Sequence, residues 1–153
     1  MTEAIRQGDI PGVQLRRRRH FAGIDAATLW RWLTEDDKLG CWLADEAVAR
    51  PGPSGGLELR PGGAAREVGE TVAHEPPHLW VLAFRRDDWN VSTRLELTLS
   101  EDSAGIELSV LQNGFEHLPL SDGLTLWETY RRRWTEALDR LGQALASPNR
   151  VLP

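Results

Sequence analysis

The chain has 153 residues, of which 41% are hydrophobic and 27% are charged. A chain of this length can build one hydrophobic core, and its composition excludes a disordered or a collagen-like protein. Acidic residues outnumber Lys and Arg by 23 to 18, which leaves a net charge of -5. Because an acidic protein is repelled by the phosphate backbone, we do not expect nucleic acid to be a partner.

Three further features indicate the compartment. The longest apolar stretch, 79–84, is far shorter than the roughly 20 residues that cross a bilayer, so we expect no membrane partner. The N-terminus is polar and has no signal-peptide core. The single cysteine, Cys41, cannot form an intrachain disulfide and is expected to be a small buried residue. We therefore expect a cytoplasmic protein.

The first predicted element is a strand over 13–21, which contains four consecutive arginines at 16–19. Side chains alternate between the two faces of a strand, so two of these arginines must point to each face. If the inner face is the one that carries Leu15, Arg17 and Arg19 point into the protein.

Two short helices are predicted next. Asp25 is a good N-cap for a helix over 26–33, which places Trp30 and two leucines at helical spacing. The segment 34–37 reads Thr-Glu-Asp-Asp, which has the form of a capping box for the second helix. The apolar side of that second helix is predicted to consist of Leu39, Trp42 and Leu43.

From Asp45 onward, short β-prone runs alternate with Gly and Pro, which is typical of an antiparallel meander. The clearest strand is 91–99, where mostly apolar side chains on one face alternate with polar ones on the other. The same alternation at 106–110, after a turn, predicts a hairpin between the two runs. The run 78–85 is apolar on both faces and is predicted to be a central strand.

The last predicted element is a long amphipathic helix that begins at about Ser121 or Asp122 and ends at Leu145. A strand, two short helices, several antiparallel strands and a long helix make an α+β domain. We expect a single domain over 13–146, with short tails at 1–12 and 147–153.

Several short motifs also follow one another in a characteristic order. They are Thr28 to Thr34 with Trp42, then Gly69 to Val72, Pro76 to Leu79, Leu111 to Phe115, and Trp134 to Leu141. In this order they resemble the domain named for the activator of the heat-shock-protein-90 ATPase, within the SRPBCC or START-like superfamily that includes polyketide cyclases. The resemblance extends from about Leu15 to Leu145. It implies a helix-grip fold, in which a curved antiparallel sheet wraps the C-terminal helix and often leaves a cavity, and it implies no catalytic residues.

Aromatic residues on the inner side of the last helix are candidates for a ligand pocket. Trp127, Tyr130 and Trp134 offer large rigid surfaces for an apolar or ring-bearing ligand. The facing wall of such a pocket would be formed by strand residues, namely Leu95, Leu97, Leu108 and Val110. The alternative is that all these side chains simply fill the core.

An arginine on the apolar side of the last helix, Arg131, suggests a charged contact inside the domain, and Arg17 or Arg19 could join it. A buried guanidinium needs a partner, because an unpaired buried charge is very costly. That partner could be an anionic group of a ligand. The alternative is an internal ion pair with Glu70, Glu96 or Glu128, with the arginine stem packed on a Trp.

Two other sequence motifs do not predict a catalytic or metal site. The stretch 52–56 matches Gly-x-Ser-x-Gly, but a nucleophile elbow needs a strand before the serine and a helix after it, and here a loop leads into a strand. His74 and His78 are separated by two prolines, so they cannot bind one metal from a helical turn, and both are expected at the surface. We predict no catalytic residue, no metal and no cofactor.

The leading hypothesis is a binding domain that holds one small, largely apolar molecule, with or without an anionic group, between the sheet and the last helix. A second hypothesis, which the family name suggests, is a chaperone co-factor or another protein-interaction domain. A third is an enzyme of the polyketide-cyclase kind, in which the pocket folds a reactive substrate. Related domains are often monomers or dimers, so we expect a monomer or a homodimer.

Overall fold

A computed structural model describes residues 8–63 and 65–146 of the chain. Seven antiparallel strands form one sheet in the order β1-β7-β6-β5-β4-β3-β2. The strands are β1 Gln14–Ala22, β2 Glu46–Arg50, β3 Gly56–Arg60, β4 Glu67–Glu75, β5 Leu79–Arg86, β6 Thr93–Asp102 and β7 Gly105–Asn113. The helices are α2 Ala26–Thr34, α3 Asp36–Leu39, the short 3-10 helix η1 Phe115–His117, and α4 Leu120–Ala146.

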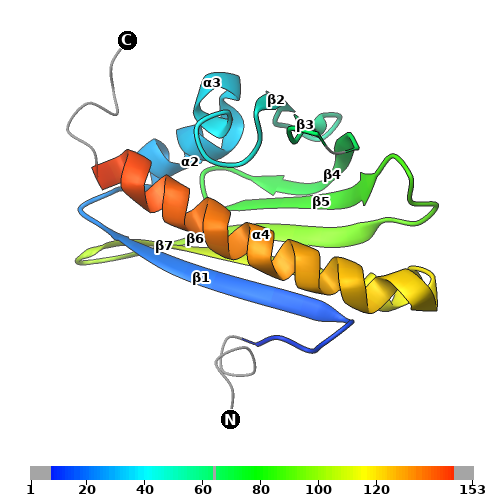
Figure 1. Ribbon diagram of the computed structural model, residues 1–153. Coiled ribbons are helices and arrows are strands. Elements are labelled where there is room, and N and C mark those ends of the chain that lie inside the picture. The colour runs from blue at the N-terminus through cyan, green and yellow to red at the C-terminus, as the bar shows by residue number, and fades with distance from the viewer. Residues whose placement is uncertain (1–7, 64, 147–153) are drawn as a thin grey trace.

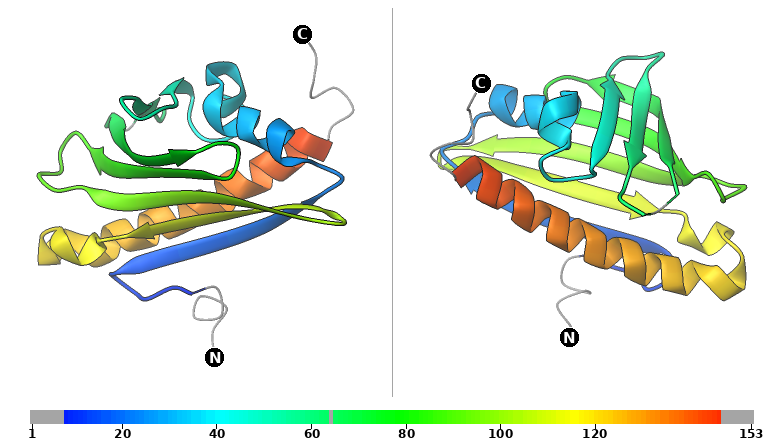
Figure 2. Two further views of the ribbon diagram at one scale, coloured as in Figure 1. Left: turned by 180° about the vertical axis from the view of Figure 1, so that it is seen from behind. Right: turned by 45° about the horizontal axis from the view of Figure 1, so that its top comes forward.

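The long helix α4 crosses one face of the sheet and runs beside β1 (Figure 1). The short helices α2 and α3 lie over the end of the sheet where α4 finishes, and the views from behind and from above show the same arrangement (Figure 2). A curved antiparallel sheet around a C-terminal helix is the helix-grip arrangement. The α+β prediction is therefore confirmed.

The periodicity of the sequence located the central strands. β6 and β7 form a hairpin in which Leu97 is opposite Val110, and the inward residues of both strands are buried. β5 is fourth in the strand order and has apolar residues on both faces. The prediction that the run 78–85 is central is confirmed.

The two short helices differ in how well the sequence predicts them. Asp25 caps α2 as expected, because its carboxylate accepts a hydrogen bond from the backbone N–H of Thr28. The capping box at Thr34 is wrong: Thr34 is the last residue of α2, and its hydroxyl donates to the Trp30 carbonyl instead. The second helix ends at Leu39, so Trp42 and Leu43 belong to the turn that follows it.

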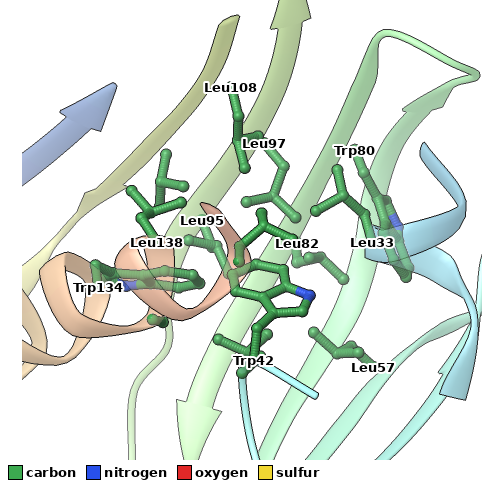
Figure 3. Packing of buried hydrophobic residues seen from close by; sticks show 14 of the residues in the cluster. Leu33, Trp42, Leu57, Trp80, Leu82, Leu95, Leu97, Leu108, Trp134 and Leu138 are labelled. Atoms are coloured by element: carbon green, nitrogen blue, oxygen red, sulfur yellow. The ribbon is translucent and has the colours of Figure 1, made fainter. Parts of the chain in front are cut away.

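The interior lies between the sheet and α4 and is filled by leucines and aromatic rings. Trp42 is 2% exposed and lies among side chains of α4 and the strands, including Trp134, Leu82 and Leu57 (Figure 3). A loop side chain thus occupies space between the two layers. None of the described helices has a stretch long and apolar enough to cross a membrane.

A chain of hydrogen bonds crosses this interior from α4 to β5. The Trp134 indole donates to the side-chain oxygen of Gln112 at 2.9 Å, and the Gln112 amide donates to the Thr93 hydroxyl at 3.0 Å. The Thr93 hydroxyl donates in turn to the Phe84 carbonyl at 2.9 Å. Gln112 is fully buried, so these bonds satisfy groups that water cannot reach.

Replacing Gln112 with leucine is expected to lower the free energy of unfolding by about 1–3 kcal/mol, because the Trp134 N–H loses its buried acceptor. The measurement is urea unfolding followed by tryptophan fluorescence. Gln143→Leu on the exposed side of α4 is the control, and it is expected to change stability by less than about 0.5 kcal/mol. Equal effects of the two substitutions would contradict a structural role for the buried chain of hydrogen bonds.

Candidate functional site

The three aromatic residues predicted on the inner side of α4 all lie there and are buried, with 2–3% of each exposed. Each also has a polar partner within the protein. The Trp127 indole donates to the Gln14 carbonyl at 2.7 Å, the Trp134 indole donates to Gln112, and the Tyr130 hydroxyl donates to Glu67. These contacts fix α4 against β1, β7 and β4.

The predicted facing wall is assembled as well. Its four residues are on the inner face of β6 and β7 and are at most 3% exposed, namely Leu95, Leu97, Leu108 and Val110. Figure 3 shows Leu95 near Trp134 and Trp42, with Leu97 and Leu108 farther along the same face of the sheet. The structure therefore brings the predicted aromatic and aliphatic residues together as one packed cluster. Their role as ligand contacts stays a prediction.

Arg17 points inward, as the strand alternation predicts, and is 8% exposed. Its guanidinium donates to both carboxylate oxygens of Asp9, at 2.9 and 3.0 Å, and to the Thr135 hydroxyl at 3.0 Å. Asp9 lies in the stretch expected to be a tail, and it is 5% exposed. The positive charge of Arg17 is therefore neutralised by Asp9 rather than left for an anionic group of a ligand.

The other two candidate arginines have internal partners too. Arg19 pairs with Asp139 of α4, and both side chains are largely exposed. Arg131 donates to Glu128 at 2.9 Å, and its guanidinium lies 5.4 Å from the ring centre of Trp127. Of the two alternatives considered for Arg131, the structure has the internal ion pair, with Glu128, and it places the guanidinium rather than a ligand against Trp127.

Three remaining expectations can be placed. The prediction that Cys41 is buried is wrong, because it follows the end of α3 in an exposed turn. His74 is half-buried rather than at the surface, with its ring centre 5.8 Å from that of Trp30, whereas His78 is exposed. The Gly-x-Ser-x-Gly stretch forms the turn between β2 and β3, as expected for a loop that leads into a strand.

A charged cluster that the sequence did not reveal lies under α4. Glu67, the first residue of β4, is 2% exposed, and one of its carboxylate oxygens, Oε2, accepts hydrogen bonds from both Tyr130 and Arg133. Arg133 also donates to the Leu43 carbonyl at 3.2 Å. The only sequence signal was the spacing of Tyr130 and Arg133, which puts both on neighbouring turns of one helix face.

Aromatic rings surround Tyr130 on its other sides. The ring centres of Trp89, Phe84 and Phe115 lie 5.5, 6.1 and 6.1 Å from that of Tyr130. Burial raises the pKa of the Tyr130 hydroxyl, and the neighbouring Glu67 carboxylate raises that pKa further. Tyr130 therefore remains a neutral hydrogen-bond donor at physiological pH.

The raised pKa predicts how stability depends on alkaline pH. Tyr130 is the only tyrosine in the chain, so tyrosinate absorbance reports this residue alone. In the unfolded chain it should ionise near its ordinary pKa of about 10, while the folded protein keeps the proton. Its contribution to stability is complete below that pH and is lost as the pH rises further. Identical absorbance titrations of the native and the urea-unfolded protein would contradict this.

Of the hollows in the described part of the structure, two are lined in part by residues of α4. One, of about 640 Å³, is lined by residues that include Arg86, Trp89, Asp122 and Leu126, and we call it the Trp89 hollow. It lies where the turn between β5 and β6 approaches the start of α4 (Figure 1). The other, of about 420 Å³, lies between α4 and the turn that carries Trp42. Neither hollow is lined by the residues predicted as ligand contacts, so the Trp89 hollow is a site that the sequence did not indicate.

On two residues that contact Tyr130, one buried polar atom each has no hydrogen-bond partner within the described part of the chain. They are Oε1 of Glu67, the carboxylate oxygen that Tyr130 and Arg133 leave free, and the indole Nε1 of Trp89. Trp89 is 7% exposed and belongs both to the lining of the hollow and to the aromatic shell of Tyr130. A buried polar group without a partner costs about 1–3 kcal/mol, so native proteins leave few such groups.

The comparisons with known proteins bear on the whole domain. The family model described as "Activator of Hsp90 ATPase homolog 1-like protein" matches residues 24–146. The chain belongs to this family. Members of the Hsp90 ATPase activator homolog 1-like family have the START-like fold described above, and the resemblance found in the sequence motifs is confirmed. No curated protein matches the chain.

Solved structures share the fold of this family member over almost its full length. A protein from Rhodobacter sphaeroides is 26% identical, with a TM-score of 0.73 and coverage of 91% of this chain and 96% of that one. CalU16 from Micromonospora echinospora is 22% identical, with a TM-score of 0.63 and coverage of 90% and 77%. DynU16, a protein of the dynemicin biosynthetic locus, is 15% identical, with a TM-score of 0.72 and coverage of 88% and 47%.

Proposed function

We propose that this domain binds one small, largely apolar molecule between the sheet and α4, and that the molecule enters through the Trp89 hollow. The observation that carries the proposal is the pair of unpartnered polar atoms, Glu67 Oε1 and Trp89 Nε1, within an otherwise aromatic environment. Ligand sites typically combine apolar walls with a few well-placed polar groups. The aromatic rings around Tyr130 supply the apolar walls, and these two atoms supply the polar groups.

Entry requires Trp89 to move, and its position makes this possible. Trp89 follows the end of β5 in a turn, where its backbone N–H bonds to the Arg86 carbonyl at 2.9 Å. Its side chain is therefore carried by a turn rather than by the ladder of the sheet, and its indole N–H gains no hydrogen bond from the closed position. Because Trp89 lies between the hollow and Tyr130, rotating its ring outward would open a path from the hollow to the Tyr130 ring.

The family supports the same proposal in general terms. DynU16 belongs to a biosynthetic locus, which fits a fold that handles small molecules. The chaperone and cyclase hypotheses stay predictions, because no contact among the described residues favours either.

The proposal is tested with N-phenyl-1-naphthylamine, a neutral dye whose fluorescence rises in apolar sites. We expect saturable binding of one dye per chain. Leu126→Trp fills the Trp89 hollow and should weaken the binding about tenfold or more, since a blocked site loses the buried contact area. Leu124→Trp, at a position that is 57% exposed, is the matched control and should bind like the unmodified protein. No saturable binding, or equal binding by both variants, would overturn the proposal.

A further inference from the structure

We infer that the ligand of this site carries a neutral hydroxyl group and is not an anion. The inference rests on the proposed function and adds the chemical class of the ligand. The two free atoms at the site have opposite requirements: Glu67 Oε1 needs a donor, and Trp89 Nε1 needs an acceptor. A hydroxyl group is the smallest group that donates one hydrogen bond and accepts others.

The two atoms belong to one connected group of residues. Glu67 of β4 is paired in register with Arg86 of β5, and the Arg86 guanidinium lies 5.6 Å from the ring centre of Trp89. Tyr130 joins them from the side of α4, because its hydroxyl bonds to Glu67 and its ring packs against Trp89. Glu67 and Trp89 therefore both contact Tyr130, and the inferred ligand lies with its ring beside Tyr130 and its hydroxyl directed toward these two residues.

The charges around the site disfavour an anionic ligand. Arg133 is paired with Glu67, and Arg86 donates to both carboxylate oxygens of Asp88 at 2.7 and 2.6 Å. Asp88 and Asp122 also line the Trp89 hollow. Among the described residues that line the hollow, a carboxylate or phosphate would therefore meet no unpaired cation, and it would approach the buried Glu67 carboxylate. Burying a charge without a partner is strongly unfavourable.

A cationic ligand can form a hydrogen bond with only one of the two unpartnered atoms. An ammonium group can donate to Glu67 Oε1, but it has no lone pair to accept a bond from the Trp89 indole. A purely apolar ligand would leave both atoms without partners. Among these classes, only a neutral group that both donates and accepts meets both requirements, and an alcohol or a phenol does so with a single small group.

The experiment compares three ligands with the same ring system by equilibrium dialysis near neutral pH: naphthalene, 2-naphthol and 2-naphthoate. We expect 2-naphthol to bind at least about tenfold more tightly than naphthalene, because two buried groups gain partners. We expect 2-naphthoate to bind most weakly. Equal or tighter binding of 2-naphthoate would overturn the inference while leaving the proposed function intact, provided that the neutral dye binds.

Two variants test whether Trp89 and Glu67 are the residues that cause the preference for 2-naphthol. Trp89→Phe keeps an aromatic ring and removes only the indole N–H, so it should weaken 2-naphthol binding several-fold and leave naphthalene unchanged. Glu67→Gln keeps an acceptor for Tyr130 and Arg133 but removes the charge, so it should narrow the gap between 2-naphthol and 2-naphthoate. Glu70→Gln, at an exposed position of the same strand, is the control and should change nothing.

The outcomes separate the inference from the function. If the dye binds but both Trp89→Phe and Glu67→Gln retain the full preference for 2-naphthol, the two atoms do not select the ligand and the inference fails. If neither the dye nor any of the three naphthalenes binds, the inference and the proposed function fail together. Should Glu67→Gln not fold, the comparison of Trp89→Phe with the unmodified protein decides the matter.

Discussion

Asp9→Ala is expected to lower the free energy of unfolding by about 3–5 kcal/mol, because it leaves the Arg17 charge buried without a partner. The side chain of Asp9 is 0% exposed and that of Arg17 is 10% exposed, so water cannot replace the lost carboxylate easily. Asp9 also accepts a hydrogen bond from the backbone N–H of Arg16 at 2.8 Å, which is lost as well. The measurement is the free energy of unfolding from urea titration.

A second substitution separates charge from packing. Asp9→Ala combined with Arg17→Met removes both charges and keeps an apolar stem of similar length, so it should recover much of the loss. Asp139→Ala breaks the exposed pair with Arg19 and should cost less than about 1 kcal/mol. If the double variant were no more stable than Asp9→Ala alone, the buried ion pair would not explain the effect.

Trp42→Ala is expected to cost about 3–5 kcal/mol, the usual range for removing a large buried aromatic side chain. Trp42 is 2% exposed and lies between α4 and the strands, where its indole donates to the Trp32 carbonyl at 3.0 Å. The substitution leaves a cavity bounded by Trp134 and Leu57, two residues that the rigid layers hold apart (Figure 3). Thermal and urea unfolding both measure the change.

Two further variants test whether the loss of stability comes mainly from the lost ring volume of Trp42 or from its lost indole hydrogen bond. Trp42→Phe keeps most of the ring and should cost about 1–3 kcal/mol, mainly from the lost indole bond. Trp30→Ala, at a half-buried position of α2, should cost clearly less than Trp42→Ala. A loss at Trp42 no larger than the loss at Trp30 would contradict the central place of Trp42 in the core.

The sequence predicts those elements of the fold whose apolar residues recur with a regular period. Alternation in 91–99 and 106–110 gave the β6–β7 hairpin, and the apolar line of the last helix gave α4, because burial on one face imposes a period. The inward direction of Arg17 followed from the same rule. Its partner Asp9 did not, because Asp9 lies in a short irregular segment before β1 that has no period to interpret.

The candidate site was only partly predictable for a related reason. Tyr130 was found because it lies on the predicted inner side of the last helix. Glu67 was not, because a glutamate that follows Arg66 at the start of a strand resembles solvent-exposed sequence, and its partner Arg133 is far away in the chain. Likewise, helical spacing predicted that Arg131 would be the inward-pointing arginine of the last helix. The arginine that pairs with the buried Glu67 is Arg133, and this contact depends on how β4 and α4 pack in the folded protein.

The most direct test of ligand binding beside Tyr130 is the NMR spectrum of the indole N–H groups during titration with 2-naphthol. The chain has seven tryptophans, and Trp89→Phe assigns the signal of interest by its disappearance. We predict that the Trp89 signal moves saturably, while those of Trp30 and Trp80, which pack together beside His74, stay in place. A Trp89 signal that stays fixed at saturating 2-naphthol would contradict the account.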